Sequence, residues 1–308
     1  MQELLQAFDI NAAVIGTEQL SGGCIHKTIR IRTTKGDLIA QELHPTAFPD
    51  LEALMHKLIS VTDYLRKNAP DCVTLHFYAA RDGSYLHNGW RLADCISGTV
   101  RNDRSPETAY AAGKAFGTFQ SVLRDYPPIK EPPFHDPAKR FAELEAAASA
   151  AVGQTERELL SRLHRLRQPA CFLSEQALPF HTVHNDTKIS NLLFSKKSDL
   201  PTVIDLDTVG TGLAAYDFGD AVRSLHGRSE QLDRSILKAF TGGFLEGAAH
   251  LTPEERDLLP FGIVSVSAEL AARYLTDHLT GNHYFHRPDS LSRAAQLTAL
   301  AESTAARL

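Results

Sequence analysis

The feature that most constrains this chain is a run of polar, chemically active residues past its middle. In order, the run carries His184, Asp186, Lys188, Asn191, Asp205 and Asp207. The first four form the pattern H-x-D-x-K-x-x-N, and an apolar stretch at 202–204 precedes the two later aspartates. A loop that used Asp and Asn only to form turns would not need this order of residue types. The run therefore predicts a site for phosphate chemistry, in a loop between two core strands.

The residue types match the needs of phosphoryl transfer to a hydroxyl. That reaction requires a carboxylate to take the hydroxyl proton and oxygen ligands to hold Mg²⁺ on the nucleotide phosphates. Asp186 is the candidate base, and Asn191 and Asp205 are the candidate metal ligands. Asp207 is a further candidate, because alternation along a continuing strand places it on the same side as Asp205. Lys188 is expected near the transferred phosphate, where it would offset developing charge.

Two nearby residues are expected to support this loop. His184 is expected to brace it from inside. Asp217 begins a literal Asp-Phe-Gly sequence, the kinase metal motif, but Asp205 already occupies the expected metal position. We therefore expect Asp217 to cap a helix that runs through Arg223.

Composition limits the partners and the location of the chain. With 308 residues and 43% hydrophobic content, it can bury a sizeable core and form two domains. A net charge of -5 without a concentrated basic run predicts no nucleic acid and no membrane partner. No secretion signal or membrane-length apolar run is found, and the scattered cysteines suit free thiols, so a cytoplasmic location is expected. The cysteines are Cys24, Cys72, Cys95 and Cys171.

The first third of the chain has the pattern of a small, mostly antiparallel sheet. Alternation predicts strands at 17–20, 26–33, 38–43, 73–79 and 85–94. A helix over 50–67, with Asp50 as its N-cap, interrupts them. The turn between the first two strands contains Gly22 and Gly23, whose backbone amides can approach nucleotide phosphates closely.

After a link at 94–98 the chain becomes mainly helical. Ser105 is a typical N-cap followed by proline and predicts a helix from 106, and His135-Asp136-Pro137 predicts the start of another. Further helices are expected at 154–168, 170–178, 229–247, 253–279 and 287–308. The predicted fold class is α+β. A first lobe over 1–94 contains the antiparallel sheet, 95–98 is a hinge, and 99–308 is a mainly helical lobe.

These motifs resemble the aminoglycoside phosphotransferase and choline kinase superfamily, and they are most similar to its N-acetylhexosamine 1-kinase branch. The most specific segments are HNDTK at 184–188 and IDLDT at 204–208. The similarity also includes 41–68, 90–98, 134–141, 203–223 and 273–285. It implies a bilobal protein-kinase-like fold. It also implies an enzyme that uses ATP and Mg²⁺ to phosphorylate a sugar hydroxyl, with the anomeric hydroxyl of an N-acetylhexosamine as an expected target.

The resemblance assigns further roles by position. The sugar would contact His26, Arg273 and Tyr284. The adenine base would contact the backbone of the interlobe link, at Asp94, Cys95 and Ile96. Asp217 would brace the backbone of the catalytic loop.

The sequence departs from the family pattern at the nucleotide side. A protein kinase carries a phosphate-binding lysine on the strand that here spans 38–43, but this chain has Gln41 and Glu42. Lys27, Arg30 or Arg32 would have to replace that lysine, or the glycine turn and the metal would have to suffice.

Departures near the expected sugar side leave the acceptor open. Segment 208–212 lacks an expected Met-Pro pair, and Asn282 stands where an acid is usual. An aminoglycoside would need clustered acids, which 281–308 lacks. Choline would need an aromatic cage, and Tyr284 and Phe285 alone would make an incomplete one. The alternatives are another small hydroxyl compound as acceptor, or a non-catalytic nucleotide-binding regulator. The oligomeric state is left open.

Overall fold

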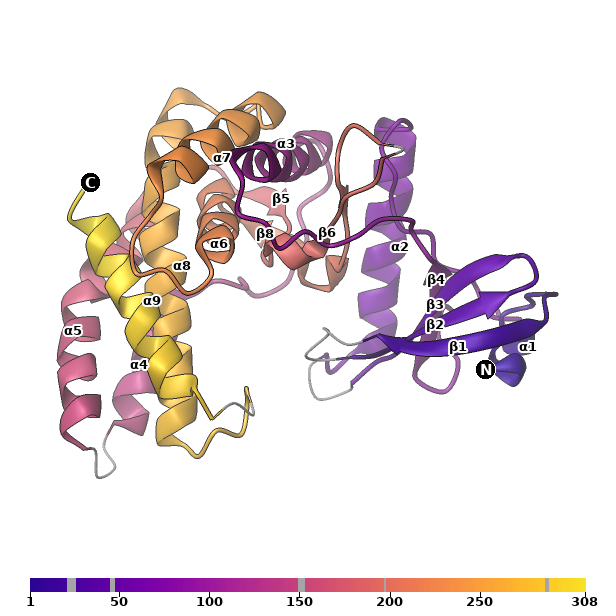
Figure 1. The fold of residues 1–308 in the computed structure, drawn as a ribbon, viewed down its shortest axis with the longest axis horizontal. Helices are drawn as coiled ribbons and strands as arrows, with labels where there is room; N and C mark the ends of the chain where they lie inside the picture. The colour runs from indigo at the N-terminus through magenta and orange to yellow at the C-terminus, as the bar shows by residue number, and fades with distance from the viewer. Residues whose placement is uncertain (21–25, 45–47, 149–152, 197, 286–287) are drawn as a thin grey trace. The chain divides into compact units, whose positions relative to one another are not determined.

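The computed structural model describes residues 1–20, 26–44, 48–148, 153–196, 198–285 and 288–308. The chain divides into two compact units (Figure 1). The first unit comprises 1–99 with 195–198, and the second comprises 100–194 with 199–308. A predominantly antiparallel sheet in the first and helices in the second confirm the α+β class. Gly22 and Gly23, predicted to contact phosphates, lie outside the described residues.

The first unit is built on a four-stranded antiparallel sheet of order β1-β2-β3-β4. Its strands are β1 Val14–Leu20, β2 Lys27–Thr33, β3 Gly36–Glu42 and β4 Trp90–Asp94. Alternate residues such as Ile31 and Ala40 are fully buried, against the short helix α1 Gln2–Ala7. Helix α2 Leu51–Asn68 begins as predicted, because the side chain of Asp50 accepts a hydrogen bond of 2.9 Å from the Ala53 N–H.

The strands predicted at 73–79 and 85–94 are largely wrong. Within 85–94 only β4 forms, because Asn88 and Gly89 adopt φ values of 49° and 78° and turn the chain just before it. Segment 73–79 runs beside β4, where the Tyr78 N–H donates to Leu92 O at 2.9 Å. Within that segment only an isolated bridge at Phe77 forms, so the alternation marked a half-buried extended segment and not a strand.

The second unit is a helical assembly around α8. Its helices are α3 Pro106–Val122, α4 Pro137–Ala147, α5 Gln154–Cys171, α6 Ala214–His226, α7 Arg234–Gly247, α8 Pro253–Leu279 and α9 Ser290–Ala305. The predicted helix starts are confirmed: α3 has the expected N-cap Ser105, and α4 begins at Pro137 with Asp136 as its N-cap. The region 170–178 continues α5 to Cys171 and then forms a short 3-10 helix at Phe172–Glu175.

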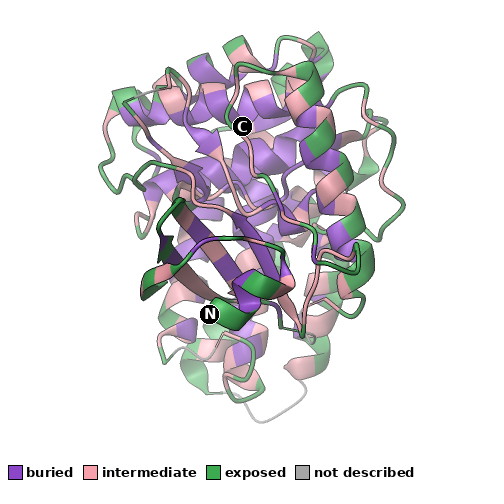
Figure 2. Ribbon diagram, turned by 90° about the vertical axis from the view of Figure 1, so that its right-hand side faces the viewer, coloured by how far each residue is buried: buried purple, intermediate pink, exposed green. Residues whose placement is uncertain are grey.

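Helix α8 is the core helix of this unit, packing against α4, α5, α6 and α9. By length and composition alone it could cross a membrane, but 72% of its apolar window is buried inside the protein. Figure 2 colours the chain by burial and shows buried residues on the sheet and on the helices. Helix α8 crosses α6 at Gly219 and Gly262 with no room for a side chain. A Cβ at Gly262 would lie 1.7 Å from Ala215 O, and one at Gly219 would lie 2.2 Å from Gly262 O. This close crossing fixes α6, which supports the candidate site.

Short strands frame the loop of the second unit that carries Asp186, Lys188 and Asn191. Strand β5 His181–Val183 pairs with β8 Gly210–Gly212, and β6 Leu192–Leu193 pairs with β7 Thr202–Val203. Both pairs are antiparallel. Residues 184–191 therefore leave one small sheet and enter the other, and the second aspartate segment, 205–208, follows directly after β7. The loop is held at both of its ends.

Candidate active site

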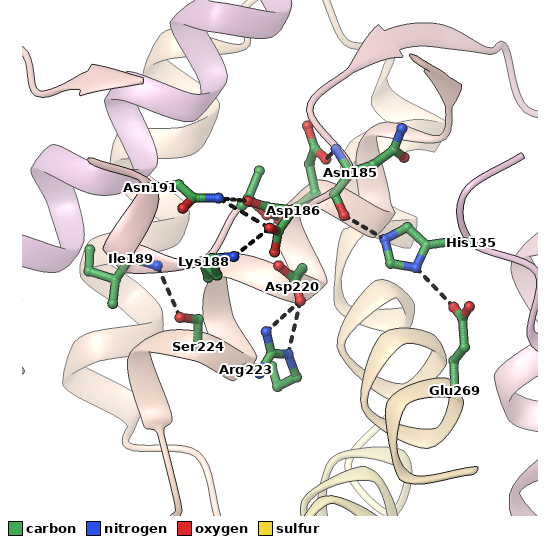
Figure 3. A network of polar contacts seen from close by, with 12 residues as sticks. His135, Asn185, Asp186, Lys188, Ile189, Asn191, Asp220, Arg223, Ser224 and Glu269 are labelled. Carbon is green, nitrogen blue, oxygen red and sulfur yellow. Dashed lines mark hydrogen bonds and ion pairs between the residues drawn. The ribbon is translucent and has the colours of Figure 1, made fainter. Parts of the chain in front are cut away.

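Three of the predicted residues meet around the carboxylate of Asp186 (Figure 3). Lys188 Nζ donates to Asp186 Oδ2 at 2.6 Å. Asn191 Nδ2 donates to Asp186 O at 2.8 Å and lies 3.3 Å from Oδ2. Because the amide nitrogen of Asn191 is used in this way, its amide oxygen is the atom left to face a metal. The structure thus places the candidate base, cation and amide in one cluster.

Asp205 joins this cluster through Lys188, whose Nζ lies 3.8 Å from Asp205 Oδ2. The expected strand alternation of Asp205 and Asp207 is wrong. Asp205 has φ 61° and ψ 58°, a left-handed conformation that Asp tolerates, and a 3-10 helix Leu206–Thr208 follows at once. Asp207 is buried in that 3-10 helix, while the Asp205 side chain is partly exposed. The two carboxylates are therefore neighbours with different surroundings.

The charges of the cluster perturb one another. Burial raises the pKa of Asp186, but the charge and hydrogen bond of Lys188 outweigh it and hold that pKa below its ordinary value. Burial lowers the pKa of Lys188, but Asp186 and Asp205 outweigh it and raise that pKa. Burial, and then the nearby Asp207, raise the pKa of Asp205. Asp186 and Lys188 therefore form an ion pair at neutral pH, and Asp205 lies in a carboxylate-rich setting that favours a bound cation.

Asp217 holds the backbone of the loop from α6. Its carboxylate accepts the N–H of His184 at 2.9 Å and that of Asn185 at 2.7 Å. It also accepts from Gln120 Nε2 at 2.8 Å, and the side chain is fully buried. The predicted capping role is wrong, because α6 begins at Ala214 after Leu213, and Asp217 lies inside its first turn. The bracing role implied by the resemblance is confirmed by these contacts.

His184 supports the loop from within, as expected. Its ring is fully buried against Phe116 and Phe119. Nδ1 accepts the Asp186 N–H at 3.2 Å, so Nε2 must carry the proton that it shares with Ile204 O at 3.0 Å. The ring therefore joins the loop 184–191 to the segment that leads into Asp205.

Sequence reasoning missed a second layer on α6. Arg223 donates to Asp220 Oδ1 through Nε at 2.9 Å and Nη2 at 2.6 Å, and both residues are buried below Asp186 (Figure 3). Ser224 Oγ accepts the Ile189 N–H at 3.0 Å. A possible signal was the i, i+3 spacing of Asp220 and Arg223, which places opposite charges on one helix face. The Ser224 contact fastens the loop to α6 a second time.

Arg273 and Tyr284, predicted to contact the acceptor, are brought together. Arg273 Nη2 donates to Tyr284 Oη at 3.0 Å, and its guanidinium lies 5.3 Å from the centre of the Tyr284 ring. Asp277, on the same helix α8, accepts the Tyr284 N–H at 2.7 Å and so holds the turn that carries the tyrosine. Asn282, one of the departures from the family pattern, is in this turn with φ 61°.

The other predicted contacts belong to the first unit. His26 Nδ1 accepts the His44 N–H at 3.2 Å, and its ring lies 5.7 Å from that of Phe48. In the predicted adenine segment, Asp94 Oδ1 accepts from Tyr78 OH at 2.6 Å, and Cys95 and Ile96 are half-buried. Burial, together with Asp94, raises the pKa of Tyr78 to about 12. The contacts of these residues with sugar or nucleotide remain predictions.

The strand position of the absent lysine is occupied by Gln41, whose side-chain amide lies between Arg91 and Thr28. Arg91 Nε donates to Gln41 Oε1 at 3.0 Å, and Gln41 Nε2 donates to Thr28 Oγ1 at 3.2 Å. Two of the three candidate replacement cations are already paired, since Lys27 lies 3.6 Å from Glu42 and Arg30 pairs with Asp37.

The comparisons with known proteins agree with this geometry. Residues 16–254 match the model of the phosphotransferase enzyme family, APH. The chain belongs to this family. Most of its length is included in the match, among it the whole segment from Asp186 to Asp205.

Several solved structures share the fold of this chain. An aminoglycoside phosphotransferase from Alicyclobacillus acidocaldarius is 15% identical with a TM-score of 0.72, over 99% of this chain and 93% of the other. A microcompartment-associated aminopropanol kinase is 19% identical with a TM-score of 0.68, over 99% and 97%. An amicoumacin kinase in complex with AMP-PNP and Ca²⁺ is 12% identical with a TM-score of 0.65, over 98% and 93%. At these identities the likeness establishes the fold, and the predicted protein-kinase-like architecture is confirmed.

Proposed function

We propose that this phosphotransferase is an ATP- and Mg²⁺-dependent kinase that transfers the γ-phosphoryl group to a hydroxyl of an N-acetylhexosamine, with the anomeric hydroxyl as the first candidate. The observation that carries the proposal is the pair formed by Asp186 and Lys188, 2.6 Å apart and flanked by Asn191 and Asp205. A carboxylate, a cation and two further oxygen donors in one cluster are the groups that phosphoryl transfer uses.

Asp186 is the proposed base. It is ionised at neutral pH because Lys188 holds its pKa below the ordinary value, so it can orient an acceptor hydroxyl and take its proton. Lys188 contacts Asp186 and also lies near Asp205, so its charge is available where the phosphoryl group would pass. Positioning and charge stabilisation would then supply most of the acceleration.

The residues present fit a hard divalent cation. Asn191 offers an amide oxygen and Asp205 a carboxylate, and Asp207 is a neighbouring carboxylate that could help. Among the described residues no three His, Cys, Asp or Glu side chains converge as a metal site, which fits a magnesium ion held largely by phosphates and water. When bound, the ion would neutralise phosphate charge. Gly22, Gly23 and the backbone at 94–96 remain the proposed nucleotide contacts.

The acceptor assignment draws support from Arg273. Its guanidinium lies 5.3 Å from the centre of the Tyr284 ring and 5.6 Å from that of Phe285. A cation already over both rings disfavours the quaternary ammonium of choline or the ammonium groups of an aminoglycoside there. Neutral sugar hydroxyls can instead accept from arginine and bond to tyrosine. His26 is the proposed third contact.

The decisive experiment measures ADP release with ATP and Mg²⁺ over a panel of acceptors. The panel contains N-acetylglucosamine, N-acetylgalactosamine, their free amines, choline and kanamycin, and Asp186→Asn is the control. Release that depends on an N-acetylhexosamine and is lost in the control supports the proposal, and phosphorus NMR then identifies the phosphorylated oxygen. Release with choline or kanamycin alone would replace the acceptor, and nucleotide binding without any release would favour a non-catalytic regulator.

A further inference from the structure

The peptide bond that precedes Asp186 is held at both of its polar atoms by histidine rings. The N–H of Asp186 donates to His184 Nδ1 at 3.2 Å. The carbonyl oxygen of the same peptide, Asn185 O, lies 3.0 Å from His135 Nε2. His184 is part of the loop motif, whereas His135 comes from the segment just before α4 and has no role in the proposed transfer. Figure 3 shows His135 between Asn185 and Glu269.

The partners of His135 determine its protonation. Asn185 O can only accept, so Nε2 must carry a proton. Nδ1 lies 2.9 Å from Glu269 Oε2, which is a carboxylate oxygen and also an acceptor. With both nitrogens facing acceptors, the ring is an imidazolium paired with a carboxylate. Burial lowers the pKa of His135, but the charge of Glu269 outweighs it and raises that pKa.

Glu269 anchors this contact to the core helix α8. Its side chain is 3% exposed, and Oε1 also accepts the Asp136 N–H at 3.3 Å and lies 3.8 Å from Arg140 Nε. The His135 ring packs 5.1 Å from those of Phe134 and Tyr216. Asp217 and Asp220, on α6, also raise its pKa through their charges. His135 is thus held by α6 and α8, and it reaches the loop 184–191 through its hydrogen bond to Asn185 O.

That contact lies at a residue whose conformation needs support. Asn185 has φ 67°, in the left-handed region that non-glycine residues adopt at a cost. Asp217 holds its N–H, and its own Nδ2 donates to Thr208 O at 2.9 Å. His135 holds its carbonyl. Without that last bond, the 185–186 peptide is held only at its N–H, by His184 at 3.2 Å, and a rotation of this peptide would move the carboxylate of Asp186.

We propose that His135 and Glu269 form a positioning pair that sets the orientation of the Asn185–Asp186 peptide and thereby aims the base. This inference rests on the proposed function, because it assigns the pair an effect on turnover through Asp186. The pair touches neither acceptor nor nucleotide in this account. Its loss should therefore lower kcat more than it changes either KM.

The test removes both members together. His135→Phe alone would strand the charge of Glu269 in the core, so the variant is His135→Phe/Glu269→Leu, which keeps the packing volume close. The matched control is His278→Phe/Glu156→Leu, which removes a His–Glu pair of 3.2 Å between α8 and α5 that is away from the loop. We expect kcat to fall about 10–100-fold in the first variant, with the nucleotide KM changed by no more than about threefold, and to be retained in the control.

A conservative variant separates positioning from general stability. Glu269→Gln removes the charge but can still hold His135, now neutral with its proton on Nε2, by donating to Nδ1. We expect this variant to lose clearly less kcat than the double variant. The inference would be overturned if kcat fell only in proportion to the fraction of protein that is unfolded. It would also be overturned if the control variant lost as much kcat as the double variant.

Amide hydrogen exchange tests the same inference without turnover. In the ligand-free folded protein, the segment 184–191 should exchange faster in His135→Phe/Glu269→Leu and remain protected in the control variant. Unchanged protection of this segment would refute the positioning role. An inactive wild-type chain would instead reject the proposed function and leave the exchange result to decide the contact.

Discussion

Lys188 Nζ donates a hydrogen bond of 2.6 Å to Asp186 Oδ2, two residues earlier in the chain. The candidate base, Asp186, and the cation expected near the transferred phosphate, Lys188, are therefore already paired. The same ammonium lies 3.8 Å from Asp205, so it is shared between the base and the proposed metal carboxylate. Because Lys188 contacts both carboxylates, a substitution of Asp186, Lys188 or Asp205 should also affect the other two side chains.

Asp186→Asn should abolish most turnover while leaving nucleotide affinity near the wild-type value. The substitution keeps the size of the side chain and its contact with Asn191 but removes the proton acceptor, so kcat should fall about 10³-fold. Steady-state kinetics and nucleotide titration calorimetry measure the two quantities. Substantial residual turnover would reject Asp186 as the base.

Asp205→Ala should weaken the binding of Mg-nucleotide by at least about tenfold, because it removes a proposed metal carboxylate. Calorimetry with Mg²⁺ and with EDTA separates metal-dependent from metal-independent binding. Asp207→Asn is the matched variant, since Asp207 is the adjacent buried carboxylate. Unchanged binding in Asp205→Ala, with a loss in Asp207→Asn, would move the metal role to Asp207.

The pH profile of kcat/KM should have no acid limb from Asp186 in the neutral range. Lys188 lowers the pKa of Asp186, so its ionised form, and the stability from the pair, persist above the ordinary Asp value of about 3.9 and are lost as pH falls through the lower folded value. The pKa of Lys188 is raised, so its charged form, and the stability from the pair, are lost only as pH rises above the ordinary Lys value and through the higher folded value. Lys188→Met should shift the acid limb to higher pH. A limb at the same pH in both proteins would contradict this coupling.

Asp217→Ala should destabilise the helical unit as well as slow turnover. It would leave the buried N–H groups of His184 and Asn185 without their acceptor, which should reduce the free energy of unfolding by about 2–4 kcal/mol. Urea unfolding followed by circular dichroism measures this. Gln120→Met removes another donor to the same carboxylate and should cost less, because the two backbone contacts remain.

Arg273→Ala should raise the acceptor KM about tenfold and leave the nucleotide KM unchanged, because a charge-assisted hydrogen bond to a sugar would be lost. Tyr284→Phe keeps the ring under the guanidinium but removes the hydroxyl that Arg273 contacts. If each substitution changed the nucleotide KM as much as the acceptor KM, the Arg273–Tyr284 pair would be structural.

Contacts that are local in the chain were predictable. Asp186 meets Lys188 and Asn191 two and five residues away, so the motif spacing was enough to bring them together. Likewise, the caps at Ser105 and Asp136 depend on residues within a single turn. The family resemblance then supplied the bracing role of Asp217, which spacing alone had misassigned to a helix cap.

Contacts between distant segments were not predictable in this way. No local pattern links His135 to Glu269, which are 134 residues apart. The left-handed conformation of Asp205 was also not predicted. An apolar run followed by Asp-Leu-Asp has the same alternation whether the strand continues or ends. Both features depend on tertiary packing, which a local sequence pattern does not record.

Helix α8 presents Glu269, Arg273 and Asp277 at intervals of four residues, and so along one face. The first supports the catalytic loop through His135, the second contacts Tyr284, and the third fastens the turn that carries Tyr284. That turn lies beyond the end of the helix, where changes in length or composition need not disturb the loop. Under the proposed function, the acceptor preference can therefore change through a few residues after position 279 without altering the loop that carries Asp186.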